Sequence, residues 1–431
     1  MSGRPSLPRR LADWLAYLEK LHPTAIELSL DRVRTVRARL GLDPGFPIIT
    51  VGGTNGKGST CAFLEAMLVA AGRRVGCYTS PHLLAYNERV RIDGLPVTDA
   101  ALCRAFATVE AARGEVSLTY FEFGTLAALL CFVEAGVEVA VLEVGMGGRL
   151  DAVNVFDAEV AVVTTVDLDH MAWLGPDREH IGREKAGIYR PGRPAICADC
   201  DPPATLVAYA QAIGADLRCL GRDFGWEPST TGWRFWRRAG GHLVCLEALP
   251  PPALIGAYQY ANAAAAVEAL LALAPRVNIA EEAIRAGLAG VHLPGRFQVV
   301  PGPPQRILDV AHNPQGARML AANLAQAPIA GRTLAVCAML ADKDMEGVVR
   351  ALVDQVDAWF VAGLPPPRGA PATTLAASVR RLARGAPCAT YADVRSAHAA
   401  ACMAAAQGDR ILIFGSFYTV AAVLAELTGS A

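Results

Sequence analysis

The 431-residue chain is 53 % apolar and carries 40 Lys and Arg against 41 Asp and Glu, a formal net charge of −1. Its length predicts two or three domains of about 100–200 residues each. The charge balance excludes a general nucleic-acid-binding protein, which needs a basic excess. The richest apolar stretch, residues 125–144, contains Glu134, Glu138 and Glu143, so we expect no membrane span.

The N-terminal segment and the cysteines indicate the cellular compartment of the protein. Arg9 and Arg10 are followed by no apolar signal core, which predicts a cytoplasmic protein, and we expect a monomer. The 11 cysteines are mostly scattered singly, which is not typical of a disulfide framework. Cys197-x-x-Cys200 has no second close cysteine pair, so we favour buried, reduced cysteines over a zinc or redox site.

Strand-like apolar runs alternate with helix-like segments in the first half. We expect strands at 46–51, 74–79, 137–144 and 159–166 and helices at 57–71 and 119–135. This alternation predicts an α/β fold with a doubly wound parallel sheet and helices on both faces. The weaker pattern between Ala215 and Pro252, rich in Trp, Gly and Arg, predicts an antiparallel appendage.

A similar alternation restarts after Gly295. We expect strands at 306–310, 333–339, 358–362 and 410–414 and helices at 314–325 and 345–356. The pattern predicts a smaller C-terminal α/β domain at 296–431 after a P-loop-type domain at 1–295. Leu293-Pro-Gly-Arg-Phe297 is the expected hinge, because Pro and Gly interrupt regular structure there.

A glycine-rich segment, Thr50-Val-Gly-Gly-Thr-Asn-Gly-Lys-Gly-Ser-Thr60, lies where a predicted strand is followed by a predicted helix. Glycines let backbone N–H groups surround phosphate, and the helix N-terminus and Lys57 add positive charge. Gly58 separates Lys57 from Ser59, which departs from the strict P-loop pattern. An ordinary Gly-rich turn is the alternative. The run nevertheless predicts nucleotide binding through Gly56, Lys57, Gly58, Ser59 and Thr60, with Ser59 or Thr60 able to reach magnesium.

Two residues near the ends of predicted strands could hold a cation. Glu143 ends the strand at 137–144 and is followed by Gly145-Met-Gly-Gly148, so its carboxylate should face a crevice at the carboxyl end of the sheet. His170 follows the strand at 159–166. A surface acid and a structural histidine are the alternatives, and oxygen ligands with a neutral His suit magnesium when water and phosphate complete its shell.

These motifs, in their order along the chain, resemble those of the folylpolyglutamate synthase and dihydrofolate synthase family, within the Mur ligase superfamily. The glycine-rich segment is similar to that family's phosphate loop. The further matching segments are Thr79-Ser-Pro-His-Leu83 with Glu88-Arg-Val90, Leu142-Glu-Val-Gly-Met-Gly-Gly-Arg-Leu-Asp151, Asp169-His170 with Trp173-Leu-Gly-Pro176, Gly182-Arg-Glu-Lys-Ala-Gly187, Leu293-Pro-Gly-Arg-Phe297, Asp309-Val-Ala-His-Asn-Pro314, Met339-Leu-Ala-Asp-Lys343 and Phe414-Gly-Ser-Phe417. The resemblance extends from Leu11 to the C-terminus and implies an ATPase domain and a C-terminal domain with substrates meeting in the cleft.

The resemblance implies the metal and catalytic groups. Glu143, Ser80 and His170 would bind Mg²⁺, and Lys57 and Lys185 would complete the catalytic set. Lys185 would be carboxylated to a carbamate that holds a second magnesium. Its residue type alone indicates a helix lysine in a solvated pair with Glu184.

The resemblance also implies ATP contacts from Asn262, Arg296 and Asp309, with His312 close by. Asn262 opens a helix-like segment, and an N-cap is its alternative. Arg296 can offer a planar cation to phosphate, and Asp309 can accept from ribose hydroxyls. An interdomain ion pair and a helix cap are the alternatives for Arg296 and Asp309.

The acceptor would be a flat heteroaromatic molecule, which favours apolar and aromatic walls with few polar groups. For the segment Leu118-Thr-Tyr-Phe-Glu122, the start of an amphipathic helix with aromatic side chains in the core is the alternative. By resemblance, the residues that bind it are Thr24, Ala25, Ile26, Thr119, Tyr120, Phe121, Glu122 and Arg149.

The reaction implied is an ATP-dependent amide ligation in folate and one-carbon metabolism. The carboxylate of dihydropteroate, or of a reduced folate's glutamate tail, would attack the γ-phosphate of ATP, and L-glutamate would attack the resulting acyl phosphate. Domain closure would exclude water. A cell-wall amino-acid ligase and a P-loop switch protein are the rivals, which ADP release with and without glutamate would separate.

Overall fold

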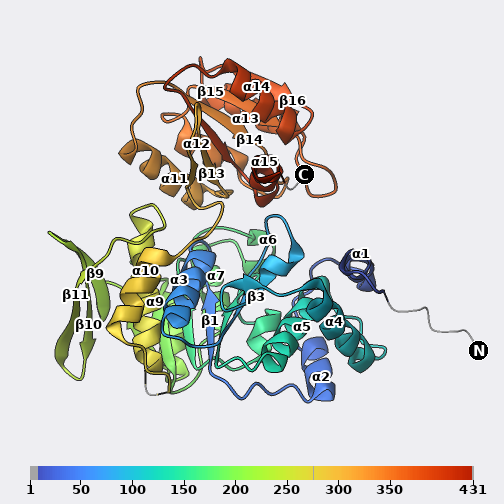
Figure 1. Cartoon of the computed structure of the whole chain (residues 1–431), viewed down its shortest axis with the longest axis vertical. Helices are drawn as coiled ribbons and strands as arrows, with labels where there is room; N and C mark the ends of the chain where they lie inside the picture. Colours follow the sequence, from blue (N-terminus) through green and yellow to red (C-terminus); the bar gives the residue numbers. More distant parts are fainter. Residues whose placement is uncertain (1–7, 275, 430–431) are drawn as a thin grey trace, which may run out of the picture. The chain divides into compact units, whose positions relative to one another are not determined.

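The computed structural model describes residues 8–274 and 276–429. Contacts between Cα atoms divide the chain into two compact units. Of the described residues, the first unit contains 8–251, 261–274 and 276–291, and the second contains 252–260 and 292–429. Each unit is described by itself below, and Figure 1 labels the elements.

The first unit is an α/β unit whose elements follow the chain in the order below. They are α1 (Leu11–Leu21), α2 (Asp31–Leu40), β1 (Ile48–Gly52), α3 (Lys57–Ala70), β2 (Val75–Tyr78), the 3-10 turn η1 (Tyr86–Arg89), β3 (Val90–Ile92), β4 (Leu95–Pro96), α4 (Asp99–Arg113), α5 (Tyr120–Glu134), β5 (Val139–Glu143), the 3-10 turn η2 (Ala152–Val155), β6 (Val160–Val163), α6 (Met171–Leu174), α7 (Arg178–Ala186), β7 (Pro194–Cys197), α8 (Ala204–Ala212), β8 (Asp216–Cys219), β9 (Phe224–Ser229), β10 (Gly232–Ala239), β11 (His242–Leu249) and α10 (Glu281–Gly290). Helix α9 (Tyr258–Leu273) begins in the residues grouped with the second unit and continues in the first.

The main sheet of the first unit has the strand order β4-β3-β2-β5-β1-β6-β7-β8. Strands β2 to β8 in this order pair in parallel, whereas β3 and β4 form an antiparallel edge. The central strands β1, β5 and β6 are buried along their whole length, as expected for strands covered on both faces. Because the chain crosses from β1 to β2 and later from β5 to β6, the strand order reverses around β1, where α/β proteins bind ligands.

Helices cover this sheet in two groups. Helix α3 packs on β1, β2 and β5, and α10 packs on α3, as the yellow and blue ribbons of Figure 1 show. Helices α1, α2, α4 and α5 pack together in a second group, in which Trp14, Phe106 and Phe123 form a fully buried aromatic cluster. One continuous apolar cluster joins this second group of helices to residues of β5 and β6.

Within the segment between Ala215 and Pro252, β9, β10 and β11 form the expected antiparallel appendage, whereas β8 is a parallel edge strand of the main sheet. Trp233 is fully buried in it and donates from Nε1 to the carbonyl of Pro250. Arg218 and Arg237 both form ion pairs with Glu268 of α9, whose side chain is 1 % exposed. Arg237 connects β10 of the appendage to α9, and Arg218 connects the edge strand β8 of the main sheet to the same carboxylate.

The second unit contains a six-stranded sheet and its covering helices. The elements are β12 (Gln298–Val300), β13 (Gln305–Asp309), α11 (Pro314–Gln326), β14 (Thr333–Cys337), α12 (Met345–Leu352), β15 (Ala358–Ala362), α13 (Ala372–Leu382), β16 (Cys388–Tyr391), α14 (Val394–Ala404), β17 (Arg410–Phe414) and α15 (Phe417–Thr428). The strand order is β12-β13-β17-β14-β15-β16, and only β12 is antiparallel to its neighbour.

Most predicted elements are found within one or two residues of their expected ends. Helix α12 is the main difference, because it ends at Leu352 rather than Val356. Helix caps account for several starts: Asn313 accepts from the backbone N–H of Gly316, and Pro314 occupies the first turn. None of the helices in the described ranges is both long and apolar enough to cross a membrane.

Candidate active site

The candidate nucleotide-binding residues of the first unit meet at the carboxyl edge of the main sheet. The glycine-rich loop follows β1, Glu143 ends β5, and residues 164–170 follow β6. Strand β1 lies between β5 and β6, with Val51 paired to Glu143 and Gly52 to Val163. The three segments are therefore neighbours in space, although Asn55 of the glycine-rich loop lies 109 residues before Thr164 in sequence.

The loop itself depends on glycine at two positions. Gly53 and Gly56 have φ values of +142° and +89°. A Cβ added to Gly53 would lie 1.9 Å from Oγ1 of Thr164, and one added to Gly56 would lie 2.5 Å from Oδ1 of Asn262. The loop backbone thus passes directly against both side chains, and only glycine fits.

The loop is already bonded to the segment after β6. Thr54 donates its N–H to the carbonyl of Thr165 at 2.7 Å, and its Oγ1 donates to the carbonyl of Asp167 at 3.1 Å. Thr164 donates its Oγ1 to the carbonyl of Asn55 at 2.6 Å. These bonds hold the loop in one shape.

The start of α3 presents groups that fit a phosphate. Lys57 donates from Nζ to the carbonyls of Gly53 and Thr54 at 3.1 and 3.2 Å, so its ammonium lies over the loop. Ser59 and Thr60 are buried in the first turn, and Oγ1 of Thr60 has no hydrogen-bond partner in the described part of the chain. An orphaned hydroxyl, a helix N-terminus and a lysine together suit a triphosphate.

Asn262 is not the N-cap that its sequence position suggested. Helix α9 begins at Tyr258, so Asn262 lies inside the helix, buried, with its side chain against Gly56. This contact joins α9 to the phosphate loop within the first unit. Gly56, the residue before Lys57, therefore lies against Asn262.

Glu143 and Ser80, two of the residues expected to bind a cation, are in contact. Glu143 is 4 % exposed and accepts from the backbone N–H of Ser80 at 2.9 Å through Oε2. The Ser80–Pro81 peptide bond is cis. A buried carboxylate beside a serine hydroxyl is a donor set that suits magnesium.

His170 has a strained backbone at the start of α6. Its φ is +51°, which is rare for a residue with a side chain. The backbone N–H of His170 donates to Oδ1 of Asp169 at 2.8 Å, and Nε2 lies 3.9 Å from the same oxygen. Such strain gathers at functional sites.

Lys185 is not in the solvated pair with Glu184 that its residue type suggested. Its side chain is 3 % exposed on α7. Burial and, secondly, the nearby Lys57 ammonium lower its pKa to about 7, although the charges of Asp169 and Asp151 oppose this shift. Lys185 therefore lies close enough to interact electrostatically with Lys57 of the phosphate loop, with Asp169 and with Asp151.

Glu184 pairs with Arg149 instead. Arg149 donates from Nη2 and Nε to Oε1 of Glu184 at 2.9 and 3.0 Å. The loop is packed so tightly on the end of α7 that a Cβ at Gly148 would lie 2.8 Å from the carbonyls of Glu184 and Lys185. Gly148 in the loop after β5 and Gly187 at the end of α7 are needed for this close contact, because a Cβ at Gly187 would lie 2.4 Å from Cβ of Arg149.

Sequence reasoning gave no role to Asp151, which the structure places near Lys185. Asp151 is 4 % exposed, and its carboxylate accepts from the N–H groups of Met146 and Val153 at 2.9 and 3.1 Å. Burial raises its pKa to about 7 against these hydrogen bonds. The signal was an acid two residues after Arg149 in the segment Gly147-Gly148-Arg149-Leu150-Asp151.

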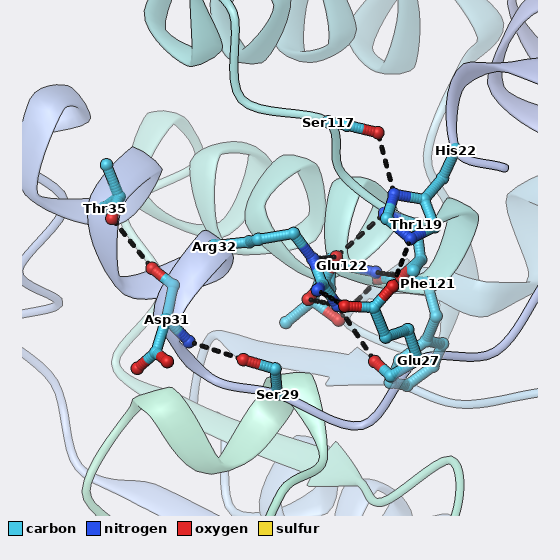
Figure 2. Close-up of polar contacts among 11 residues, drawn as sticks. His22, Glu27, Ser29, Asp31, Arg32, Thr35, Ser117, Thr119, Phe121 and Glu122 are labelled. Atoms are coloured by element: carbon cyan, nitrogen blue, oxygen red, sulfur yellow. Dashed lines mark hydrogen bonds and ion pairs between the residues drawn. The ribbon is translucent and has the colours of Figure 1, made fainter. Parts of the chain in front are cut away.

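The candidate acceptor segments are joined by Arg32 of α2 (Figure 2). Glu122 accepts from Arg32 Nη2 at 3.0 Å and from the backbone N–H of Thr119 at 2.8 Å, and Oγ1 of Thr119 accepts from the N–H of Glu122. Arg32 also pairs with Glu27 and donates to its carbonyl at 2.9 Å. One guanidinium thus holds both segments.

A histidine completes this network in Figure 2. Nδ1 of His22 lies 2.7 Å from Oγ of Ser117, and Nε2 lies 2.9 Å from Oε2 of Glu27. The bond to His22 and the charge of Arg32 lower the pKa of the Glu27 carboxyl. Thr24, Ala25 and Ile26 lie in the exposed loop that this network anchors.

Tyr120 and Phe121 are half-buried and belong to an aromatic group. The Phe121 ring lies 5.7 Å from that of Tyr78, and the Tyr120 ring lies 5.8 Å from that of Tyr86. The guanidinium of Arg89 lies over both Tyr86 and Tyr120. The start of α5 thus offers a partly open aromatic wall.

The second unit brings its own predicted residues together. Asp309 ends β13, is 6 % exposed, and accepts from the N–H groups of Phe297 and Ala311, each at 2.8 Å. Burial raises its pKa, although Arg296 opposes the shift. The carboxylate therefore caps two backbone turns rather than a helix.

Arg296 and His312 both lie near the Phe417 ring in the second unit. The guanidinium of Arg296 is 5.3 Å from the Phe417 ring centre, and the His312 ring is 6.5 Å from it. His312 donates from Nδ1 to the carbonyl of Val310 at 2.9 Å, which leaves Nε2 as the acceptor in a neutral ring.

Within the described ranges, no three His, Cys, Asp or Glu side chains are grouped so that they could hold a metal ion. All 11 cysteines are free thiols. Cys197 is buried and Cys200 is exposed.

Comparisons with known proteins agree with this architecture. Residues 51–211 match the family described as the Mur ligase middle domain, and residues 295–417 match the Mur ligase, glutamate ligase domain. The dihydrofolate synthase/folylpolyglutamate synthase of Escherichia coli K12 is 47 % identical over 97 % of this chain and 96 % of its own length. The Mycobacterium tuberculosis protein of the same name is 34 % identical over 82 % of this chain and 78 % of its own.

Solved structures are similar over the whole chain. The E. coli FolC structure in complex with DHPP and ADP has a TM-score of 0.92 at 46 % identity, covering 99 % of this chain and 100 % of that one. A bifunctional folylpolyglutamate synthase/dihydrofolate synthase with Mn, AMPPNP and L-glutamate bound has a TM-score of 0.90 at 47 % identity, with the same coverage. The chain therefore belongs to the dihydrofolate synthase/folylpolyglutamate synthase family of Mur ligases.

Proposed function

We propose that this chain is an ATP-dependent ligase that joins L-glutamate to dihydropteroate and to the glutamate tail of reduced folates. The observation that carries the proposal is the glycine loop after β1, with Lys57 over its carbonyls and the orphaned Thr60 hydroxyl in the first turn of α3. Relatives named for both activities match nearly the entire chain, which supports the double specificity.

ATP supplies the phosphoryl group that activates a carboxylate as an acyl phosphate, and a divalent ion such as Mg²⁺ neutralises its charge. The chain's part is to bind and orient. The amides at the start of α3 and Nζ of Lys57 hold phosphate oxygens. Ser80, Glu143 and His170 would hold the metal, since a carboxylate, a hydroxyl and a neutral imidazole leave room for water and phosphate ligands.

Lys185 is proposed to carry a carbamate. Because its pKa is about 7, a large share of its amine is unprotonated at neutral pH. Nitrogen then attacks CO₂, a C–N bond forms, one C=O bond opens to give a carboxylate, and a proton leaves to solvent. The anion would balance the neighbouring Lys57. Full activity of Lys185→Ala without added short-chain acids would contradict this role.

The acceptor is proposed to bind between the loop at Thr24, Ala25 and Ile26 and the start of α5. Phe121 and Tyr120 offer aromatic surface, and Arg149 offers a guanidinium to a carboxylate once Glu184 releases it. Glu122 is fully engaged by Arg32 and by the N–H of Thr119. We therefore assign Glu122 and Arg32 a positioning role.

Asn262 of the first unit and Arg296, Asp309 and His312 of the second are proposed to contact ATP. Asn262 already touches the phosphate loop. The guanidinium of Arg296 lies over the Phe417 ring and donates from Nη1 to the carbonyl of Gly295, and its positive charge suits a phosphate. The two-domain boundary at 295/296, a cytoplasmic location and a monomeric state remain part of the proposal.

The test is a set of ADP-release assays on the purified chain. Release should require L-glutamate plus either dihydropteroate or tetrahydrofolate, and mass spectrometry should detect products extended by one glutamyl residue. Turnover without glutamate would instead indicate a nucleotide switch, and dependence on a UDP-linked acceptor would indicate a cell-wall ligase.

A matched pair of variants locates the chemistry. Lys57→Ala should reduce product formation by at least about a hundredfold, because it removes a cation from the transferring phosphoryl group. Lys20→Ala, which removes an exposed lysine on α1, should change nothing. An undiminished rate in Lys57→Ala would overturn the proposed phosphate site.

A further inference from the structure

A cluster of ionisable side chains in the second unit lies outside the residues described above. Cys402 and His398 are four residues apart on α14 and so share one face of the helix. Glu426 comes from α15, which packs on α14, and Arg306 comes from β13. Cys402 is half-buried, whereas the His398 side chain is 8 % exposed.

The four side chains form a connected chain of polar contacts. Sγ of Cys402 lies 3.5 Å from Nε2 of His398, and Nδ1 of His398 lies 3.0 Å from Oε2 of Glu426. Arg306 donates from Nε to Nε2 of His398 at 3.4 Å and from Nη2 to Sγ of Cys402 at 3.8 Å. Arg395 is the other charged group here, with Nε 3.7 Å from Oε1 of Glu426.

The guanidinium determines the histidine tautomer. Arginine has donors only, so Nε2 of His398 must accept, and the ring proton sits on Nδ1 and points to Glu426. The same unprotonated Nε2 lies 3.5 Å from Sγ of Cys402, so the thiol and the guanidinium of Arg306 share one acceptor. This is the order of nucleophile, base and orienting carboxylate that activates a thiol.

We propose that Cys402 is a reactive thiol that undergoes reversible modification, with low-molecular-weight disulfides as the reacting class. The thiol proton moves to Nε2 of His398, and the sulfur attacks one sulfur of the disulfide. A new S–S bond forms as the old one breaks, and the departing thiolate takes the proton back from His398. Arg306 donates to the sulfur as negative charge develops there.

The position of the cluster separates this reaction from the proposed ATP contacts. Arg306 lies three residues before Asp309 on β13, roughly 10 Å along a strand. Glu426 lies near the end of α15, whereas Phe417 begins that helix. A metal is a poor alternative occupant, because Arg306 already places a positive charge against the thiol.

Alkylation by iodoacetamide, followed by peptide mass spectrometry, tests the proposal on the intact chain. Cys402 should react roughly tenfold or more faster than Cys103, as expected for a thiol with a general base. Cys103 is a matched control, because it is also half-buried, and burial and Asp99 raise its pKa. Exposed Cys200 reports the rate of an accessible thiol, and buried Cys61 should stay unmodified while the protein is folded.

Variants distinguish activation from mere accessibility. His398→Gln and Glu426→Gln should each slow the reaction of Cys402 about tenfold or more and leave that of Cys200 unchanged. With oxidised glutathione as the probe, wild-type protein should gain a dithiothreitol-reversible adduct on Cys402 before any other cysteine. Equal rates for Cys402 and Cys103, or a rate unaffected by both variants, would overturn the proposal.

Discussion

Replacing Lys185 by methionine should stabilise the first unit at neutral pH while abolishing the proposed ligase activity. Lys185 is 3 % exposed, and its pKa falls from 10.5 in the unfolded chain to about 7 when folded. Methionine has a similar length and carries no charge, so it removes the cost of burying an ammonium group.

The size of the effect follows from the shift in pKa. Each pKa unit corresponds to about 1.4 kcal/mol, so the lysine costs on the order of 4 kcal/mol at pH 7 and below. The unfolded chain binds the proton more tightly between pH 7 and 10.5, so wild-type stability rises with pH across this window. The advantage of Lys185→Met should therefore be largest near pH 7 and vanish near pH 10.5.

Urea unfolding at several pH values from 7 to 10 measures this difference. Buffers free of CO₂, nucleotide and divalent ions keep the lysine as an amine. Lys20→Met, at an exposed position on α1, is the control and should show no pH-dependent gain. A Lys185→Met protein that is less stable than wild type at pH 7, or whose advantage does not shrink as pH rises, would refute the reasoning.

Two further predictions concern the acceptor segments and the phosphate loop. Arg32→Met should cost about 2–4 kcal/mol of unfolding free energy, because it leaves Glu122 buried and unpaired, and should raise the KM for dihydropteroate more than that for ATP. Adding Glu122→Gln should recover most of the stability; urea unfolding of both variants checks this, and no recovery would contradict a charge-pair explanation. Gly56→Ala should weaken ATP binding at least about tenfold and cost about 1–3 kcal/mol through strain at φ +89°, since its Cβ would lie 2.5 Å from Asn262. Gly72→Ala, at φ +70° with nothing within 4 Å, controls for backbone strain alone, and equal ATP affinity by calorimetry in the two variants would count against the close contact.

The phosphate loop and its strands could be predicted because their signals are local. A buried apolar run, a glycine-rich turn and Lys57 follow one another within a dozen residues, and the structure has β1, the loop and α3 in that order. Glu143 likewise ends a strand whose apolar residues are continuous. Parallel pairing then brings these strand ends together without further information.

Arg32 and Glu122 could not be paired from sequence, because 90 residues separate them. No helical or strand period relates the two positions. The burial of Lys185 was also missed, since its neighbour Glu184 suggested a surface pair. Adjacent helix residues face different directions, and only the tertiary contact of Glu184 with Arg149 shows which of the two faces solvent.

The hydrogen bonds that attach the phosphate loop to the segment after β6 have an entropic consequence. Thr54 and Asn55 are bonded to residues 164–167 by hydrogen bonds within the protein itself. Little backbone freedom is left to lose when a triphosphate arrives, so more of its contact energy appears as affinity. The loop is preorganised for the nucleotide, and the hydrogen bonds of Thr54 and Thr164 supply its rigidity.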